Sequence, residues 1–128
     1  MTLATMLAIG TGGFVGAVTR SWMNGLISQH FPHAVPVGTL GVNLVGSFIM
    51  GILVAYFMYT TLFSIHIKSL LSTGFLGALT TYSTFAIETV MLLQSGHYAA
   101  AMANMALNTF GTVMMAGGGY WIASSVLR

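Results

Sequence analysis

The chain has 128 residues, of which 56% are hydrophobic and only 3% are charged. Soluble domains carry about 25% charged residues, so this composition excludes a soluble globular protein and indicates an all-α, multi-pass integral membrane protein. The net charge of +2 comes from too few residues to suggest a nucleic-acid partner, and the absence of cysteine excludes disulfides and thiolate metal sites.

Apolar runs separated by polar turns predict four transmembrane helices. The first covers about residues 3–27, and the second covers residues 36–62, opening on a proline whose missing N–H costs nothing at a helix start. The third covers residues 68–94 and the fourth covers residues 98–126. Because every connection is short, residues 1–128 are expected to form a single four-helix transmembrane domain.

The third helix is predicted to be broken inside its span. Between Gly74 and Phe85 it contains glycines followed by hydroxyl side chains set between aromatic rings. Glycine weakens a helix interior, and serine and threonine offer the backbone competing hydrogen bonds. Because non-helical backbone at membrane depth is tolerated only where protein or water surrounds it, the break predicts an ion or substrate site.

Polar side chains recur every four residues on the second and fourth helices, so each helix carries a polar stripe on one face. Buried asparagine is costly in lipid, and these side chains are expected to face protein, water or a ligand. On the third helix, two aromatic residues share a face, with two hydroxyl side chains close by. The residues are Thr39, Asn43 and Ser47; Asn104, Asn108 and Thr112; and Tyr82 and Phe85 with Ser83 and Thr84.

These residues offer mainly hydrogen-bond donors, namely amide N–H groups, hydroxyls and the positive edges of aromatic rings. Glu88 is the only carboxylate in the chain, and this balance suits a small anion better than a cation or a proton relay. A permeation path and simple hydrogen bonding between helices are open alternatives for the stripes.

Glu88 itself has two interpretations. It could serve a proton-coupled exchanger, or it could anchor its helix by pairing with the backbone or with a basic residue such as Arg20, and anchoring is preferred. The histidines lie in or near predicted loops, which favours solvated side chains over metal ligands. No catalytic triad or other enzyme site is recognisable, so the chain is predicted not to be an enzyme.

The few charges give little indication of orientation. With four spans, both termini and Lys68 share one side of the membrane, whereas Arg20 lies towards the other. This is a weak bias under the positive-inside rule. Insertion in both orientations, as in an antiparallel dimer, and fixed insertion directed by a partner or by the helices themselves are alternatives.

Three segments, taken in order, resemble the Fluc/CrcB family of bacterial fluoride channels. They read GGFVGA at residues 12–17, with Arg20 nearby, PVGTLGVNLVGSF at residues 36–48, and TGFLGALTTYSTF at residues 73–85, followed by Glu88. The resemblance implies an antiparallel, dual-topology homodimer with two fluoride pores in the bacterial inner membrane. Such a channel passively exports fluoride from the cytoplasm and lowers its toxicity.

The resemblance also implies specific residues. A central sodium ion, structural and not transported, would be held by the backbone carbonyls of Gly77 and Thr80 from each subunit. Asn43 would donate a hydrogen bond to fluoride, and the paired phenylalanines of the family fall on Tyr82 and Phe85, where the tyrosine departs from the usual pattern. The implied path includes Thr39, Asn43, Tyr82, Ser83, Thr84, Phe85, Asn104, Asn108 and Thr112.

Two rival functions remain. A small dual-topology multidrug-type exporter carries a carboxylate in its first helix to bind cationic drugs, whereas the first helix here has Arg20 and no acid. A non-conducting scaffold subunit would need neither aligned polar stripes nor a broken helix.

Overall fold

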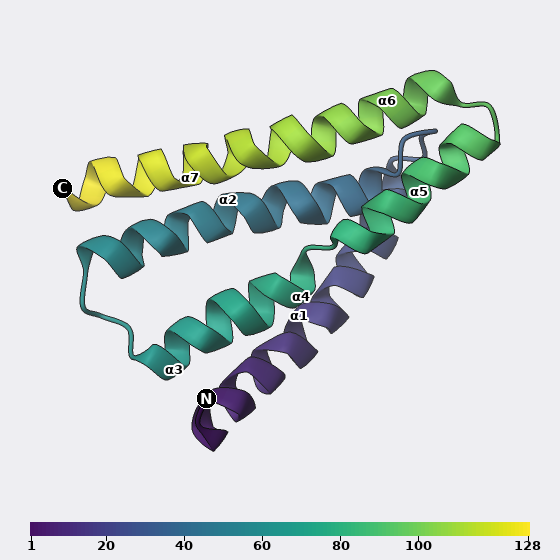
Figure 1. Ribbon diagram of the computed structural model, residues 1–128. Coiled ribbons are helices and arrows are strands. Elements are labelled where there is room, and N and C mark those ends of the chain that lie inside the picture. The colour runs from purple at the N-terminus through teal and green to yellow at the C-terminus, as the bar shows by residue number, and fades with distance from the viewer.

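The computed structural model describes residues 1–128 as an all-helical fold without strands (Figure 1). The first two helices are continuous, whereas the third and fourth are composites of shorter segments. The bounds are α1 (Leu3–His30), α2 (Val37–Tyr59), α3 (Ile65–Lys68), η1 (Ser69–Leu76), α4 (Gly77–Leu79), α5 (Tyr82–Gln94), α6 (Tyr98–Ala106), η2 (Leu107–Gly111) and α7 (Thr112–Leu127), where η1 and η2 are π-helical. The predicted four helices are confirmed.

Three helix ends differ from their predicted positions by about one turn, because local capping fixes them. α1 continues to His30, whose ring Nδ1 lies 2.8 Å from a backbone carbonyl oxygen one turn back. α2 ends at Tyr59, because Thr60 adopts an extended conformation. The third helix begins one turn earlier than predicted, since the Ser64 hydroxyl accepts a backbone N–H of its first turn at 3.3 Å.

Three of the four helices are long and apolar enough to cross a membrane, namely Leu3–His30, Val37–Tyr59 and Ile65–Gln94. The fourth, residues 98–127, is not among them, and it contains two buried asparagines and three consecutive glycines. Large apolar side chains on every helix, Phe14 and Trp121 for example, are nevertheless exposed on this chain. Such a surface suits lipid or a second subunit, and it agrees with a multi-pass membrane protein.

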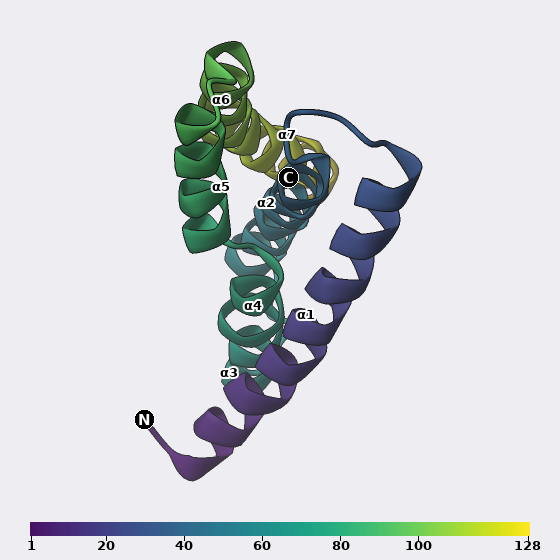
Figure 2. The same ribbon diagram turned by 90° about the vertical axis from the view of Figure 1, so that its right-hand side faces the viewer.

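α2 and α7 run side by side, and α1 lies obliquely against η1 and α4 (Figures 1 and 2). α5 pairs with α6 beyond the break in the third helix. Glycines permit the close approach of α1, because a Cβ on Gly12 or Gly16 would meet the backbone carbonyl oxygens of Leu70 or Phe75. Small residues on α1 therefore let its backbone pack closely against the third helix.

Candidate functional site

The break in the third helix lies at Thr80 and Thr81. Both residues are extended, with φ/ψ angles of −80°/153° and −147°/115°, between the helical segments α4 and α5. The helix begins again because the Thr81 hydroxyl accepts the Thr84 N–H at 3.3 Å and so caps α5. The prediction of a broken third helix is confirmed.

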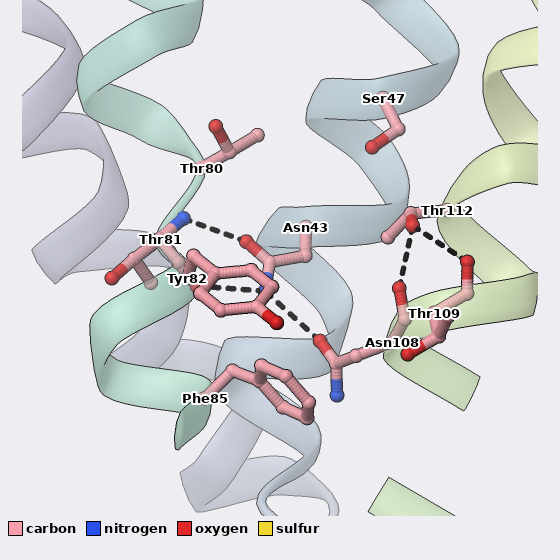
Figure 3. Close-up of a pocket in the computed structure, with 9 residues that line it drawn as sticks. All are labelled: Asn43, Ser47, Thr80, Thr81, Tyr82, Phe85, Asn108, Thr109 and Thr112. Carbon is pink, nitrogen blue, oxygen red and sulfur yellow. Dashed lines mark hydrogen bonds between the residues drawn. The ribbon is translucent and has the colours of Figure 1, made fainter. Parts of the chain in front are cut away.

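Asn43 of α2 binds both backbone groups of Thr81 (Figure 3). Its Oδ1 accepts the Thr81 N–H at 2.7 Å, and its Nδ2 donates to the Thr81 carbonyl oxygen at 3.0 Å. Both residues are buried, where a backbone group without a partner is costly. The amide of Asn43 therefore supplies the partners that the extended backbone of Thr81 cannot find within its own helix.

The break leaves the four carbonyl groups of residues 77–80 without their usual helical donors. In a continuous helix, the Gly77 oxygen would accept the Thr81 N–H, and the Thr80 oxygen would accept the Thr84 N–H. Here the first N–H donates to Asn43 and the second donates to the Thr81 hydroxyl. Gly77 and Thr80 carry the first and last of these four carbonyls, and they are the two that the family resemblance implied as sodium ligands.

A chain of side-chain amides extends from Asn43 to the fourth helix. Asn43 Nδ2 also donates to Asn108 Oδ1 at 2.9 Å, and Asn108 Nδ2 donates to Asn104 Oδ1 at 3.0 Å. Asn104 Nδ2 in turn donates to the Thr89 hydroxyl at 3.0 Å. All four residues are buried, and no buried side-chain polar atom in the chain lacks a partner. Hydrogen bonding between helices, one of the two alternatives for the stripes, is therefore present.

A pocket of about 340 Å³ lies where the break meets the two polar stripes (Figure 3). Amides, hydroxyls and two aromatic rings line it, without any Asp, Glu, Lys, Arg or His side chain. The pocket brings together predicted residues from the second, third and fourth helices. The lining residues are Asn43, Ser47, Thr80, Thr81, Tyr82, Phe85, Asn108, Thr109 and Thr112.

Tyr82 and Phe85 form the aromatic side of the pocket. Their ring centroids are 5.3 Å apart and their planes are inclined at 73°, which is an edge-to-face contact. The prediction that they share a face is therefore confirmed. Phe85 is buried, whereas Tyr82 is 81% exposed, so Tyr82 lies at an edge of the pocket that this chain alone leaves uncovered.

Several predicted site residues do not line this pocket. Thr39 and Asn104 are buried, each in a hydrogen bond to α5. Ser83 is exposed, and the Thr84 hydroxyl accepts from the Thr81 hydroxyl at 2.9 Å. The residues outside the pocket are Thr39, Gly77, Ser83, Thr84 and Asn104.

Three residues of this region, Thr81, Thr89 and Thr109, were not predicted from the sequence. Thr81 adjoins Thr80 in the run of hydroxyl residues, and this run is the sequence feature that could have indicated Thr81 as a site residue. Thr89 follows Phe85 by one helical turn, so a regular helix places both on one face. Thr109 lies in π-helical η2, where the spacing rules of a regular α-helix do not apply.

Glu88 lies outside the pocket and is held by α2. Its Oε1 accepts a hydrogen bond from the Thr39 hydroxyl at 2.5 Å. It also lines a second, open pocket of about 520 Å³, together with Pro36, which directly precedes α2, and further residues of α5. The partner of Glu88 is thus a hydroxyl group rather than Arg20, and the contact ties α5 to α2, as the anchoring interpretation expects.

The substitution Thr39→Val is expected to destabilise the protein by roughly 1.5 to 3 kcal/mol, the usual range for a hydrogen bond to a charged group. Valine keeps the shape of threonine but removes the hydroxyl donor from the half-buried Glu88 carboxylate. Thermal unfolding of the purified protein in detergent measures the effect. Thr73→Val, at an exposed position of η1, is the matched control, and an equal loss of stability in both variants would contradict the anchoring contact.

Comparison with known proteins places the chain in a family. The family model described as "CrcB-like protein, Camphor Resistance (CrcB)" matches residues 7–120. The chain belongs to the CrcB family. The resemblance seen in the sequence is therefore confirmed, and membership of this family of channels also confirms that the chain is not an enzyme.

Relatives of this CrcB chain carry a common name, "Fluoride-specific ion channel FluC". The protein of that name from Sulfurimonas denitrificans is 66% identical over 128 residues, which are 100% of this chain and 99% of the relative. The Nautilia profundicola protein is 41% identical over 128 residues and is covered completely, as is this chain. The Campylobacter fetus subsp. fetus protein is 44% identical over 123 residues, 95% of each chain.

Proposed function

We propose that this protein is a fluoride-selective channel that passively exports fluoride from the cytoplasm and so lowers its toxicity. The observation that carries the proposal is the pocket at the break, which is lined by amide and hydroxyl groups and aromatic rings without a formally charged side chain. Fluoride is small and strongly hydrated, so a path must replace its water with hydrogen-bond donors. The names of the full-length relatives agree with this proposal.

The proposed assembly is an antiparallel, dual-topology homodimer in the bacterial inner membrane. Tyr82 is 81% exposed at the edge of the pocket, and a second subunit would cover this edge and complete the path. Opposite orientations of the two subunits agree with the weak charge bias between Lys68 and Arg20. In such a dimer, each break would lie near its counterpart from the other subunit.

The proposal includes a structural sodium ion between the two breaks. The chain has no group of three or more His, Asp or Glu side chains that could hold a metal, whereas the Gly77 and Thr80 carbonyls have lost their helical donors. A hard cation prefers such oxygen ligands, and unwound backbone supplies them in membrane proteins. The ion would contribute a fixed positive charge that holds the carbonyl dipoles of two facing breaks together.

The rival function as a multidrug-type cation exporter is less well supported. That function needs a carboxylate facing the transported cation, and the only candidate is Glu88. Its Oε1 is engaged by the Thr39 hydroxyl, and the residue lies outside the pocket at the break. The two side-chain amide oxygens of the pocket, those of Asn43 and Asn108, already accept hydrogen bonds.

Fluoride efflux from liposomes tests the proposed function. The purified protein is reconstituted into liposomes loaded with potassium fluoride or potassium chloride, valinomycin is added to carry the potassium, and ion-selective electrodes record the anions. We expect rapid fluoride efflux that liposomes without protein do not show, and chloride efflux at the background rate. Fluoride efflux at the protein-free rate, or chloride efflux as fast as that of fluoride, would overturn the proposal.

A further inference from the structure

The amide of Asn43 both lines the pocket and binds the backbone at the break. It lines the pocket with its Nδ2 donating to Asn108, and its Oδ1 accepts the Thr81 N–H. A continuous helix would give that same N–H to the Gly77 carbonyl oxygen. The Thr81 N–H that would bind the Gly77 carbonyl in a continuous helix is thus held by Asn43. The Thr80 carbonyl is freed separately, by the cap that Thr81 provides.

We propose that Asn43 is a positioning residue for the cation site, because its Oδ1 keeps the third helix open and the Gly77 carbonyl available to sodium. The inference rests on the proposed function, of which the sodium ion is a part. It gives Asn43 a task that is separate from donating to fluoride. Both Nδ2 hydrogens are already engaged, one with the Thr81 carbonyl and one with Asn108 Oδ1.

The physical basis is a competition for one hydrogen atom. The Thr81 N–H is buried and needs an acceptor, which is either Asn43 Oδ1 or the Gly77 oxygen. Without the side-chain acceptor, a bond to Gly77 is the one that a regular helix makes. That bond would continue α4 into α5 and engage the Gly77 carbonyl. The cation site would lose a ligand although no ligand residue had been changed.

The test is the effect of sodium on the unfolding temperature of the full chain. Purified wild-type protein and the Asn43→Leu variant, which has a similar shape and no polar side-chain atom, are heated in detergent. The buffers contain either sodium chloride or N-methyl-D-glucamine chloride at equal ionic strength. Sodium at about 100 times its Kd is expected to raise the wild-type midpoint by roughly 5 to 10 °C. In Asn43→Leu this shift is expected to disappear.

The matched control is Asn108→Leu. It removes another buried amide from the same pocket, but it leaves the pairing of Asn43 with Thr81 intact. We expect this variant to keep the sodium shift. Asn43→Asp retains an oxygen acceptor for the Thr81 N–H and is also expected to keep it. If Asn43→Leu yields no folded protein, Asn43→Ser takes its place, because its hydroxyl is too short to reach the same N–H.

The outcomes separate this inference from the proposed function. A wild-type shift that persists in Asn43→Leu would overturn the role of Asn43 and leave the sodium site standing. Equal loss of the shift in Asn43→Leu and Asn108→Leu would also overturn it, since removal of either pocket amide would then abolish the effect of sodium. An absent shift in the wild type would remove the sodium site, and the inference with it, whereas fluoride selectivity is decided independently by the efflux assay.

Discussion

Replacement of Asn43 by aspartate is expected to reduce fluoride efflux by about 100-fold. In Asn43→Asp an anionic oxygen takes the place of Nδ2, so the Thr81 carbonyl and Asn108 Oδ1 lose their donor and face a further acceptor. Fluoride also loses the Nδ2 donor, and a hydrogen bond to a charged group is worth up to about 3 kcal/mol, which corresponds to about 100-fold in rate. The added negative charge also repels fluoride. The initial rate of efflux from proteoliposomes, at a matched amount of protein, measures the effect.

Asn24→Asp is the control for the added charge. Asn24 lies on α1, outside the pocket, and its Oδ1 accepts from the Ser28 hydroxyl at 3.1 Å. The aspartate retains this acceptor, so efflux is expected to stay close to that of the wild type. Unchanged efflux in Asn43→Asp would remove Asn43 from the fluoride path.

The second large effect is expected from Gly51→Val, at a position where α2 packs against the backbone of α7. A Cβ on Gly51 would overlap the Ala116 carbonyl oxygen and come within 2.8 Å of the Tyr120 backbone nitrogen. Backbone atoms cannot rotate away, so the two helices must separate, at a cost of roughly 1 to 3 kcal/mol or more. The separation would also move the two polar stripes apart. We expect a lower unfolding midpoint in detergent together with reduced fluoride efflux.

Gly117→Val on α7 is the matched control, because a Cβ at Gly117 meets nothing within 4 Å. Its midpoint is expected to stay near the wild-type value. Similar losses of stability in the two variants would show that valine in these helices, rather than the contact between α2 and α7, is responsible.

The sequence predicted the break in the third helix because the signal is local. Glycines and consecutive hydroxyls between Gly74 and Phe85 weaken the helix in their own neighbourhood, and the break lies at Thr80 and Thr81. The partner of the break could not be predicted in the same way. Asn43 lies 38 positions before Thr81, and their pairing depends on how two helices are aligned along their axes.

The polar stripes were predicted as faces, and the structure shows that their members have different partners. Asn43 and Asn108 meet at the break, whereas Thr39, one turn from Asn43 on the same stripe, bonds to Glu88. Periodicity gives the direction in which a side chain points, but it does not give the depth at which another helix crosses. The π-helical segment η2 could not be predicted from periodicity, because its residues do not follow the 3.6-residue period of an α-helix.

The amide chain of Asn43, Asn108 and Asn104 has a consequence for how the site can respond to an anion. A backbone N–H can only donate, so Thr81 obliges Asn43 to turn its oxygen toward the break. Asn43 must then present its nitrogen to Asn108, which presents its own nitrogen to Asn104. The orientation of each side-chain amide, that is, which way its oxygen and nitrogen face, is therefore set by the amide before it in the chain of hydrogen bonds. An anion that accepts a hydrogen bond from the Nδ2 of one asparagine leaves the Oδ1 of the next asparagine without its donor. All three amides then have to reorient together.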